Sequence, residues 1–413
     1  MVIYSSISEY SKVNNKTIRG ISTFFGYFLF LLIYVYPIGR FNAFIPYFFI
    51  GFFFALLLVF NNFTIKTKGS FLLVTIYAFL LNSIMSTLVY DVSLLASLRT
   101  FLFFVVPFLA IQLGFFIFKV WPAFSFKKIA FILLCIELVI CMIQVSRSDV
   151  GYMFMSLFGS EKYTSTYFMA GTVIRSIGTI GNPNDCGVLS SILLLVILNS
   201  RTKKYHNFLA ILFSFIIIIL TRSRSAMIIY GIVLFLSITK LFILKVNSLK
   251  RAQLIVLTAI LLFLAYLLYD KYVSRDISFD SLSSRIYIWK NVIKNSYITT
   301  SDKFFGGLFG MGITHIKSLE AMDNEYLFLF MSLGIVGSTL LLKDVISLFI
   351  ASFKIKNSSN RVVCLIIFII WILNSFVSVF FTSYLFTIIS FSFIGFSIAK
   401  NNYEINYNSC VSV

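Results

Sequence analysis

The sequence predicts an all-α protein, a polytopic bundle of about 12 transmembrane helices in a single integral membrane domain covering residues 1–413. Three observations lead to this prediction. First, 59% of the residues are hydrophobic and only 12% are charged, and the mean hydropathy of +0.96 is far above that of a soluble domain. Second, apolar segments of about 20 residues, the length of a membrane-spanning helix, recur along the chain. Third, Lys and Arg are distributed unevenly among the connecting segments.

Twelve apolar segments are candidate spans. The first follows a basic N-terminal tail and ends at Pro37 without a small-residue cleavage site, so we interpret it as an uncleaved anchor. The sixth and seventh segments are short. The approximate ranges are 20–37, 41–60, 70–90, 100–119, 129–146, 186–200, 206–221, 225–244, 252–269, 324–342, 361–380 and 383–399.

The charge distribution predicts the orientation. With the N-terminus in the cytoplasm, the cytoplasmic segments hold 20 Lys and Arg residues and three acidic residues, whereas the outer segments hold 14 and 11. This asymmetry follows the positive-inside rule. The net charge of +19 is therefore explained by topology and not by nucleic-acid binding, which needs a basic soluble face. Both termini are expected in the cytoplasm, and the long polar loops at about 147–185 and 270–323 outside.

The sequence predicts no metal site and no cofactor. The five cysteines have no metal-ligand spacing, and the two histidines are too few and too far apart. Glu137 lies within an apolar segment, where a carboxylate is costly unless it is paired or functional. We expect it to pair with another group inside the bundle.

The first outer loop ends in a polar turn. Arg175 lies among apolar residues, and the Asn182-Pro183-Asn184-Asp185 sequence signals a turn before the next span. Asn184 or Asp185 can cap the helix that follows. The alternatives are a plain loop with a helix cap and a polar site that includes Arg175.

Two arginines, Arg222 and Arg224, occupy a connection of about five residues on the predicted outer face, where short loops usually avoid basic residues. Snorkelling toward lipid headgroups would explain them. Anion binding is the alternative, strengthened by the neighbouring serine hydroxyls and by N–H groups at the start of the following helix.

The second outer loop contains Arg285, followed by aromatic residues at helical spacing that indicate an interfacial helix. The glycine-rich stretch 306–312 lacks the context of a nucleotide fingerprint, and we expect a flexible turn close to other backbone. Asp323 and Asn324 stand at the start of the tenth span, where acidic residues also favour a helix N-terminus.

These groups indicate one chemistry if they converge. Arginines bind diphosphate oxygens bidentately and stabilise the charge that develops on a leaving group. A carboxylate such as Asp323 can take the proton of an attacking hydroxyl. This set of residues favours metal-independent glycosyl transfer from a lipid diphosphate. The arginines expected to bind the diphosphate are Arg175, Arg222, Arg224 and Arg285. The supporting polar residues of the predicted site are Asn182, Asn184 and Asn324.

Over residues 170–340 the chain resembles the O-antigen polymerase (Wzy) and O-antigen ligase superfamily. The similar features come in the family's order: Arg175 before Gly-Asn-Pro-Asn, Ser223-Arg224 at a span start, Arg285 before Trp289, the 306–312 glycines, and 323–327 followed by a Gly-Ile-Val-Gly sequence. Ligases carry His-Asn where this chain has Asp323-Asn324, which favours a polymerase. The chain also departs from the polymerases' Arg-x10-Gly spacing, because eleven residues separate Arg175 from Gly187.

The resemblance implies a C-type membrane glycosyltransferase fold in the bacterial cell inner membrane. It implies transfer of a growing glycan from undecaprenyl diphosphate to the next lipid-linked repeat unit, with membrane lipids, a chain-length regulator and a flippase as further partners. The alternatives are an O-antigen ligase or a capsule or exopolysaccharide polymerase. A non-catalytic flippase is a third alternative, since twelve spans also suit a transporter, but transporters more often have related halves or helices broken at mid-membrane.

Overall fold

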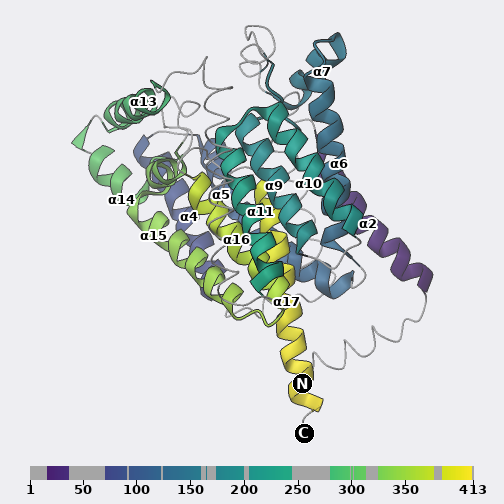
Figure 1. Ribbon diagram of the computed structural model, residues 1–413. Coiled ribbons are helices and arrows are strands. Elements are labelled where there is room, and N and C mark those ends of the chain that lie inside the picture. Colours follow the sequence, from purple (N-terminus) through teal and green to yellow (C-terminus); the bar gives the residue numbers. More distant parts are fainter. Residues whose placement is uncertain are drawn as a thin grey trace.

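The regular secondary structure of the described part of the chain is entirely helical. The computed structural model describes residues 16–36, 70–90, 93–121, 124–159, 164, 174–199, 204–243, 280–297, 299–300, 302–312, 324–375 and 384–411. Within these ranges there are thirteen α-helices and one π-helical turn, and no β-strand (Figure 1). The elements are α2 (Lys16–Tyr34), α4 (Ser70–Tyr90), α5 (Leu94–Val120), α6 (Phe126–Gln144), α7 (Asp149–Phe158), α9 (Pro183–Leu198), α10 (Lys204–Thr221), α11 (Arg224–Ile243), α13 (Asp280–Ser296), η3 (Asp302–Gly306), α14 (Gly307–Phe309), α15 (Glu325–Phe353), α16 (Ser358–Asn374) and α17 (Tyr384–Val411).

Ten of the twelve predicted apolar segments coincide with helices, and the segments 41–60 and 252–269 lie outside the described residues. By length and composition, α15 is the one described helix that is long and apolar enough to cross a membrane. Six further apolar helices or helix portions in the described part are shorter, with 10–17 residues. The all-α class is therefore confirmed for the described residues, and the number of spans stays a prediction.

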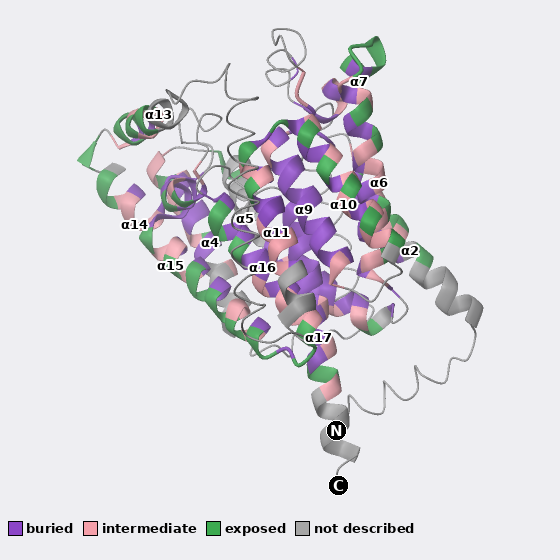
Figure 2. Ribbon diagram, in the orientation of Figure 1, coloured by how far each residue is buried: buried purple, intermediate pink, exposed green. Residues whose placement is uncertain are grey.

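Helix α9 is the centre of the bundle. Its residues from Pro183 to Ile197 are buried except for Asn184, and it packs against α6, α10, α11, α16 and α17. Figure 2 shows this buried column surrounded by helices with exposed outer faces. A helix that is apolar on every side is stable only where other helices surround it.

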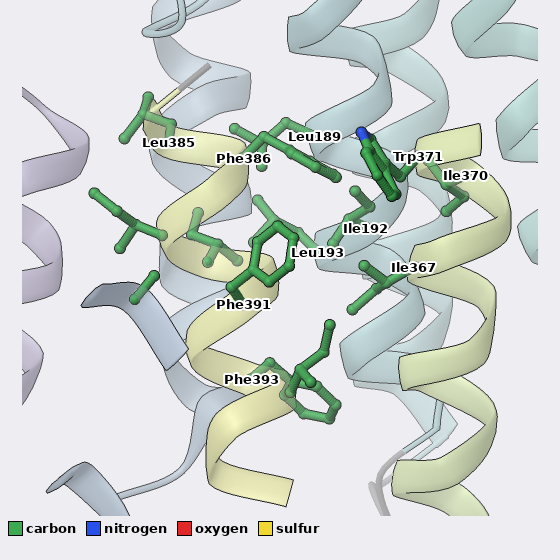
Figure 3. Close-up of a cluster of buried hydrophobic side chains, with 14 of the residues drawn as sticks. Leu189, Ile192, Leu193, Ile367, Ile370, Trp371, Leu385, Phe386, Phe391 and Phe393 are labelled. Atoms are coloured by element: carbon green, nitrogen blue, oxygen red, sulfur yellow. The ribbon is translucent and has the colours of Figure 1, made fainter. Parts of the chain in front are cut away.

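The packing of α9 against α16 and α17 fixes which helix ends lie together. In Figure 3, Leu189 near the start of α9 lies level with Trp371 near the end of α16 and with Phe386 near the start of α17. All three side chains are buried. The N-terminal ends of α9 and α17 and the C-terminal end of α16 therefore share one end of the bundle.

Several outer helices expose apolar stripes. On α10, Phe208, Leu212, Phe215 and Ile219 recur at intervals of three and four residues, and all are exposed. Helix α15 presents a similar stripe from Ile335 to Phe353. Soluble proteins rarely expose such long contiguous apolar surfaces.

Helix α15 is interrupted at Gly334, whose φ of 63° and ψ of −171° are not helical. The segment 306–312 packs against this break, and the backbone N–H groups of Met311 and Gly312 donate to the carbonyls of Met331 (2.8 Å) and Ser332 (3.2 Å). A Cβ on Gly310 would lie 2.3 Å from the Ser332 oxygen, so the two backbones touch. The expected closeness of this glycine-rich stretch to other backbone is confirmed.

Several boundaries differ from the sequence predictions, and α17 continues to Val411 instead of ending near 399. The stretch 306–312 is not a simple turn, because η3 and α14 carry helical structure through Phe309 before Gly310 turns the chain. The first polar loop contains the ten-residue helix α7, capped by the Ser148 side chain. Helix α15 does not end near 342 but continues to Phe353, because Asp344 is buried against the bundle instead of marking a polar loop. The aromatic stretch after Arg285 forms a helix as expected, because it belongs to α13.

Candidate functional site

Two polar side chains of α6 fix the segment 174–182, which carries Arg175. Gln144 accepts hydrogen bonds at Oε1 from the backbone N–H groups of Ile177 (3.0 Å) and Gly178 (2.8 Å) and from the Ser176 hydroxyl (2.8 Å). Its Nε2 donates to the Gly178 carbonyl at 3.1 Å. The buried side-chain amide of Gln144 therefore provides hydrogen-bond partners for backbone groups of a segment that has no regular secondary structure.

Glu137, seven residues earlier on the same helix, holds the next residue of the segment. Its carboxylate accepts from the Thr179 N–H (3.0 Å), the Thr179 hydroxyl (2.8 Å) and the Tyr34 hydroxyl of α2 (2.8 Å). The Cys186 thiol of α9 donates to it as well, at 3.1 Å. The expectation that Glu137 pairs inside the bundle is confirmed, and these donors are neutral groups.

Gly178 lies directly on this carboxylate. A Cβ at this position would stand 1.7 Å from Glu137 Oε1 and 2.5 Å from Cys186 Sγ, and the φ of 59° is in the left-handed region. Both conditions admit glycine and exclude other residues. The sequence alone does not single out Gly178, because neither condition is visible in it.

The cap of α9 is Asn182 and not Asn184 or Asp185 as the sequence analysis expected. The Asn182 side chain accepts from the Asn184 N–H at 2.9 Å. The reason is Pro183, which is favoured as the first helical residue and so leaves the cap to the residue before it. Asn182 therefore has a structural role, and the Asn184 side chain is available for another contact.

Arg175 reaches the connection between α10 and α11. Its Nε donates to the Thr221 carbonyl at 3.0 Å, and its guanidinium donates to Asn184 Oδ1 at 3.5 Å. The Ser223 hydroxyl donates to the same Asn184 oxygen at 2.9 Å. A cation at the C-terminal end of α10 is favourable for the helix dipole. Asn184 thus joins the first predicted loop to the connection that contains Arg222 and Arg224.

Arg222 and Arg224 are exposed beside this junction, and Arg222 has a positive φ of 52°. Ser223 between them is buried. Its hydroxyl oxygen also accepts from the Ala226 N–H at 3.3 Å, so one of the helix-start N–H groups expected for anion binding is already used. The structure therefore brings Arg175, Arg222 and Arg224 to one corner of the bundle. Arg222 and Arg224 are exposed there, whereas Arg175 is half-buried.

The start of α15 contains an acidic residue that the sequence analysis did not select. Asn324 caps the helix by accepting from the Leu327 N–H at 3.0 Å. Glu325 is fully buried, and its Oε2 accepts from Trp371 Nε1 (3.1 Å) and the Ser375 hydroxyl (2.5 Å). These partners end α16, so Glu325 lies at the same end of the bundle as the start of α9.

Replacing Glu325 by alanine is expected to lower the stability of the α15–α16 pair. The Trp371 indole N–H and the Ser375 hydroxyl would both lose the carboxylate as acceptor. The hydroxyl can still donate to the Trp371 carbonyl at 2.8 Å, so the main cost, about 1–3 kcal/mol, comes from the buried indole N–H. Glu325→Gln keeps an acceptor oxygen and should lose less. Thermal inactivation of the purified protein in detergent measures both variants, and equal midpoints for Glu325→Ala and wild type would contradict this role.

Two predicted site residues lie wholly or partly outside the described residues. Asp323 lies outside the described residues, and so does the side chain of Arg285, whose backbone belongs to α13.

One contact between two cysteines is not predicted from the sequence. Cys141 and Cys186 are 45 residues apart in the chain, yet their sulfur atoms are 3.7 Å apart. Sequence spacing cannot reveal a contact between two separate helices.

Comparisons with protein-family models and with curated proteins find no match to this chain.

Proposed function

We propose that this chain is a surface-polysaccharide polymerase of about 12 membrane spans in the bacterial cell inner membrane, of the O-antigen polymerase type. It would transfer a growing glycan from undecaprenyl diphosphate to the next lipid-linked repeat unit at the outer face. The observation that carries the proposal is the junction of Arg175 with the α10–α11 connection, which gathers Arg175, Arg222 and Arg224 from distant parts of the sequence.

The proposed reaction needs these groups in defined roles. A hydroxyl oxygen of the acceptor sugar attacks the anomeric carbon of the donor glycan, and the bond from that carbon to the diphosphate oxygen breaks. Undecaprenyl diphosphate leaves with the bonding electron pair, and a base takes the hydroxyl proton. Exposed Arg222 and Arg224 are suited to hold the diphosphate oxygens, and Arg175 to position their loop. Asp323 is the proposed base, and Arg285 a further diphosphate ligand.

The proposed location in a membrane is supported by the exposed apolar stripes of α10 and α15. Side chains such as Phe208, 66% exposed, and Ile335, 52% exposed, are costly in water and favourable against lipid. The buried polar groups described above, including Glu137, Gln144 and Glu325, are instead inside the bundle and hydrogen-bonded. That distribution is typical of a helical membrane protein.

One observation favours the flippase as a second candidate. Helix α15 is broken at Gly334, and discontinuous helices are characteristic of substrate sites in transporters. In this chain the segment 306–312 packs against the break. The N–H groups of Met311 and Gly312 donate hydrogen bonds to the carbonyls of Met331 and Ser332, so these carbonyls already have protein partners. We therefore favour the polymerase.

The two functions are separated by deleting the gene for this protein and locating the lipid-linked repeat units. The polymerase proposal predicts that single units accumulate on the outer face of the membrane and that surface glycans carry one repeat. Accumulation on the inner face would overturn it in favour of a flippase. Full-length glycans that are no longer transferred from the lipid would instead indicate a ligase.

A further inference from the structure

Two cysteines and a carboxylate meet in the interior of the bundle. The sulfur atoms of Cys141 and Cys186 are 3.7 Å apart, and Cys186 Sγ is 3.1 Å from Glu137 Oε1. The three donor atoms all lie within 4.8 Å of one another, and all three side chains are fully buried. Within the described residues this is the one group of three acidic, cysteine or histidine side chains with that proximity.

The helices present these donors without distortion. Glu137 and Cys141 are four residues apart on α6 and therefore share one face. Cys186 lies in the first turns of α9 and brings its sulfur to the α6 pair from a second helix. Gly178 closes the cluster from a third side, because only a residue without Cβ fits over Glu137 Oε1 and Cys186 Sγ.

The separation of the sulfur atoms matches shared coordination. Two sulfurs that are each about 2.3 Å from one tetrahedral zinc ion lie about 3.8 Å apart. The same separation also occurs between two thiols in simple contact, so the third donor is what distinguishes the cluster. Two thiolates with one carboxylate are a donor set that selects thiophilic cations over Mg²⁺ or Ca²⁺.

The charge of the cluster also suits a divalent cation. The buried Glu137 carboxylate accepts hydrogen bonds from the neutral donors Tyr34, Thr179 and Cys186. When a divalent cation binds, two thiol protons leave for solvent as two metal–sulfur bonds form, so the net charge does not change. The bonds from Tyr34 and Thr179 then orient the carboxylate, as outer-shell donors do around metal ligands.

We propose that Glu137, Cys141 and Cys186 form a binding site for a thiophilic divalent cation of the zinc class. The cation links α6 to α9, and through Glu137 and Thr179 it holds the segment that carries Arg175. Its role is structural. The proposal stands on the geometry of the cluster and is independent of the glycan chemistry proposed above.

The test uses the full-length protein, purified in detergent with a reductant and without chelators, and incubated with Zn²⁺ or Cd²⁺. After desalting, we expect about one bound ion per chain and, for Cd²⁺, a sulfur-to-metal charge-transfer band. Cys141→Ser and Cys186→Ser should each abolish the band, and Glu137→Gln should weaken binding about 10-fold or more. Cys135→Ser is the matched control, since Cys135 is on α6 but outside the cluster, and should bind as wild type.

A second measurement needs no variant that could misfold. Cd²⁺ bound to the wild type should protect Cys141 and Cys186, but not Cys135, from alkylation on gradual denaturation, as mapped by mass spectrometry. Wild-type protein that binds no more ion than Cys141→Ser/Cys186→Ser, or unprotected thiols in the presence of Cd²⁺, would overturn the proposal. A disulfide between Cys141 and Cys186 in the isolated protein would overturn it too. None of these readouts depends on glycan transfer.

Discussion

Replacing Gly178 by alanine is expected to destabilise the protein more than any other single methyl addition at the candidate site. The new Cβ would overlap Glu137 Oε1, at 1.7 Å, in a backbone conformation that L side chains rarely adopt. The carboxylate cannot retreat without breaking its bonds to Tyr34 and Thr179. Strain and broken buried hydrogen bonds together should cost about 3–5 kcal/mol. Thermal denaturation in detergent, followed by loss of the monodisperse peak, measures the effect.

Gly307→Ala is the matched control for this substitution. A Cβ at Gly307 would meet no atom within 4 Å, and the residue starts the helical turn α14. Its midpoint should remain within a few degrees of wild type. Equal midpoints for Gly178→Ala and Gly307→Ala would show that the packing of segment 174–182 onto Glu137 is wrong.

Replacing Arg175 by alanine is expected to reduce long glycan chains about 10- to 100-fold while the protein stays in the membrane. The change removes the bonds to the Thr221 carbonyl and to Asn184, and a hydrogen bond to a charged group contributes about 1.5–3 kcal/mol. The segment would then lose its link to the connection that carries Arg222 and Arg224. Arg175→Lys keeps the charge but not the planar guanidinium and should restore the chains only in part.

Complementation of a deletion strain measures these variants, by glycan length on gels and by protein level in membranes. Arg361→Ala is the matched control, because Arg361 lies near the start of α16, at the opposite end of that helix from Trp371, and it should support wild-type chain lengths. Long chains at the wild-type level in Arg175→Ala cells would contradict a role for the junction. So would an equal loss in Arg361→Ala cells.

The fold class follows from the sequence more readily than the site does. Apolar segments of helical length predicted ten of the described helices because burial of apolar side chains and helix length are both local properties. The continuation of α15 past Asp344 was not predicted, since a charged pair normally ends an apolar segment and the burial of Asp344 depends on other helices. The cap at Asn182 could have been found, because Pro183 favours the first helical position.

Residues that act through contacts between helices were the ones missed. Arg175 was selected from its apolar surroundings, but its partner Thr221 is 46 residues away and has no sequence signal. The sequence does not distinguish Glu325 from Asp323, since only the packing of α15 on α16 brings Trp371 and Ser375 to Glu325. Cys141 and Cys186 looked unrelated because their proximity arises from two different helices.

The central claim is that this chain lengthens lipid-linked glycans by itself. The most direct test incubates the purified protein, in detergent or lipid nanodiscs, with lipid-linked single repeat units extracted from the deletion strain. The account predicts products of two or more repeats together with released undecaprenyl diphosphate, and about 10- to 100-fold less of these products with the Arg175→Ala variant. Units that remain single with the folded wild-type protein, while lipid-linked units move across the bilayer of reconstituted vesicles, would contradict it.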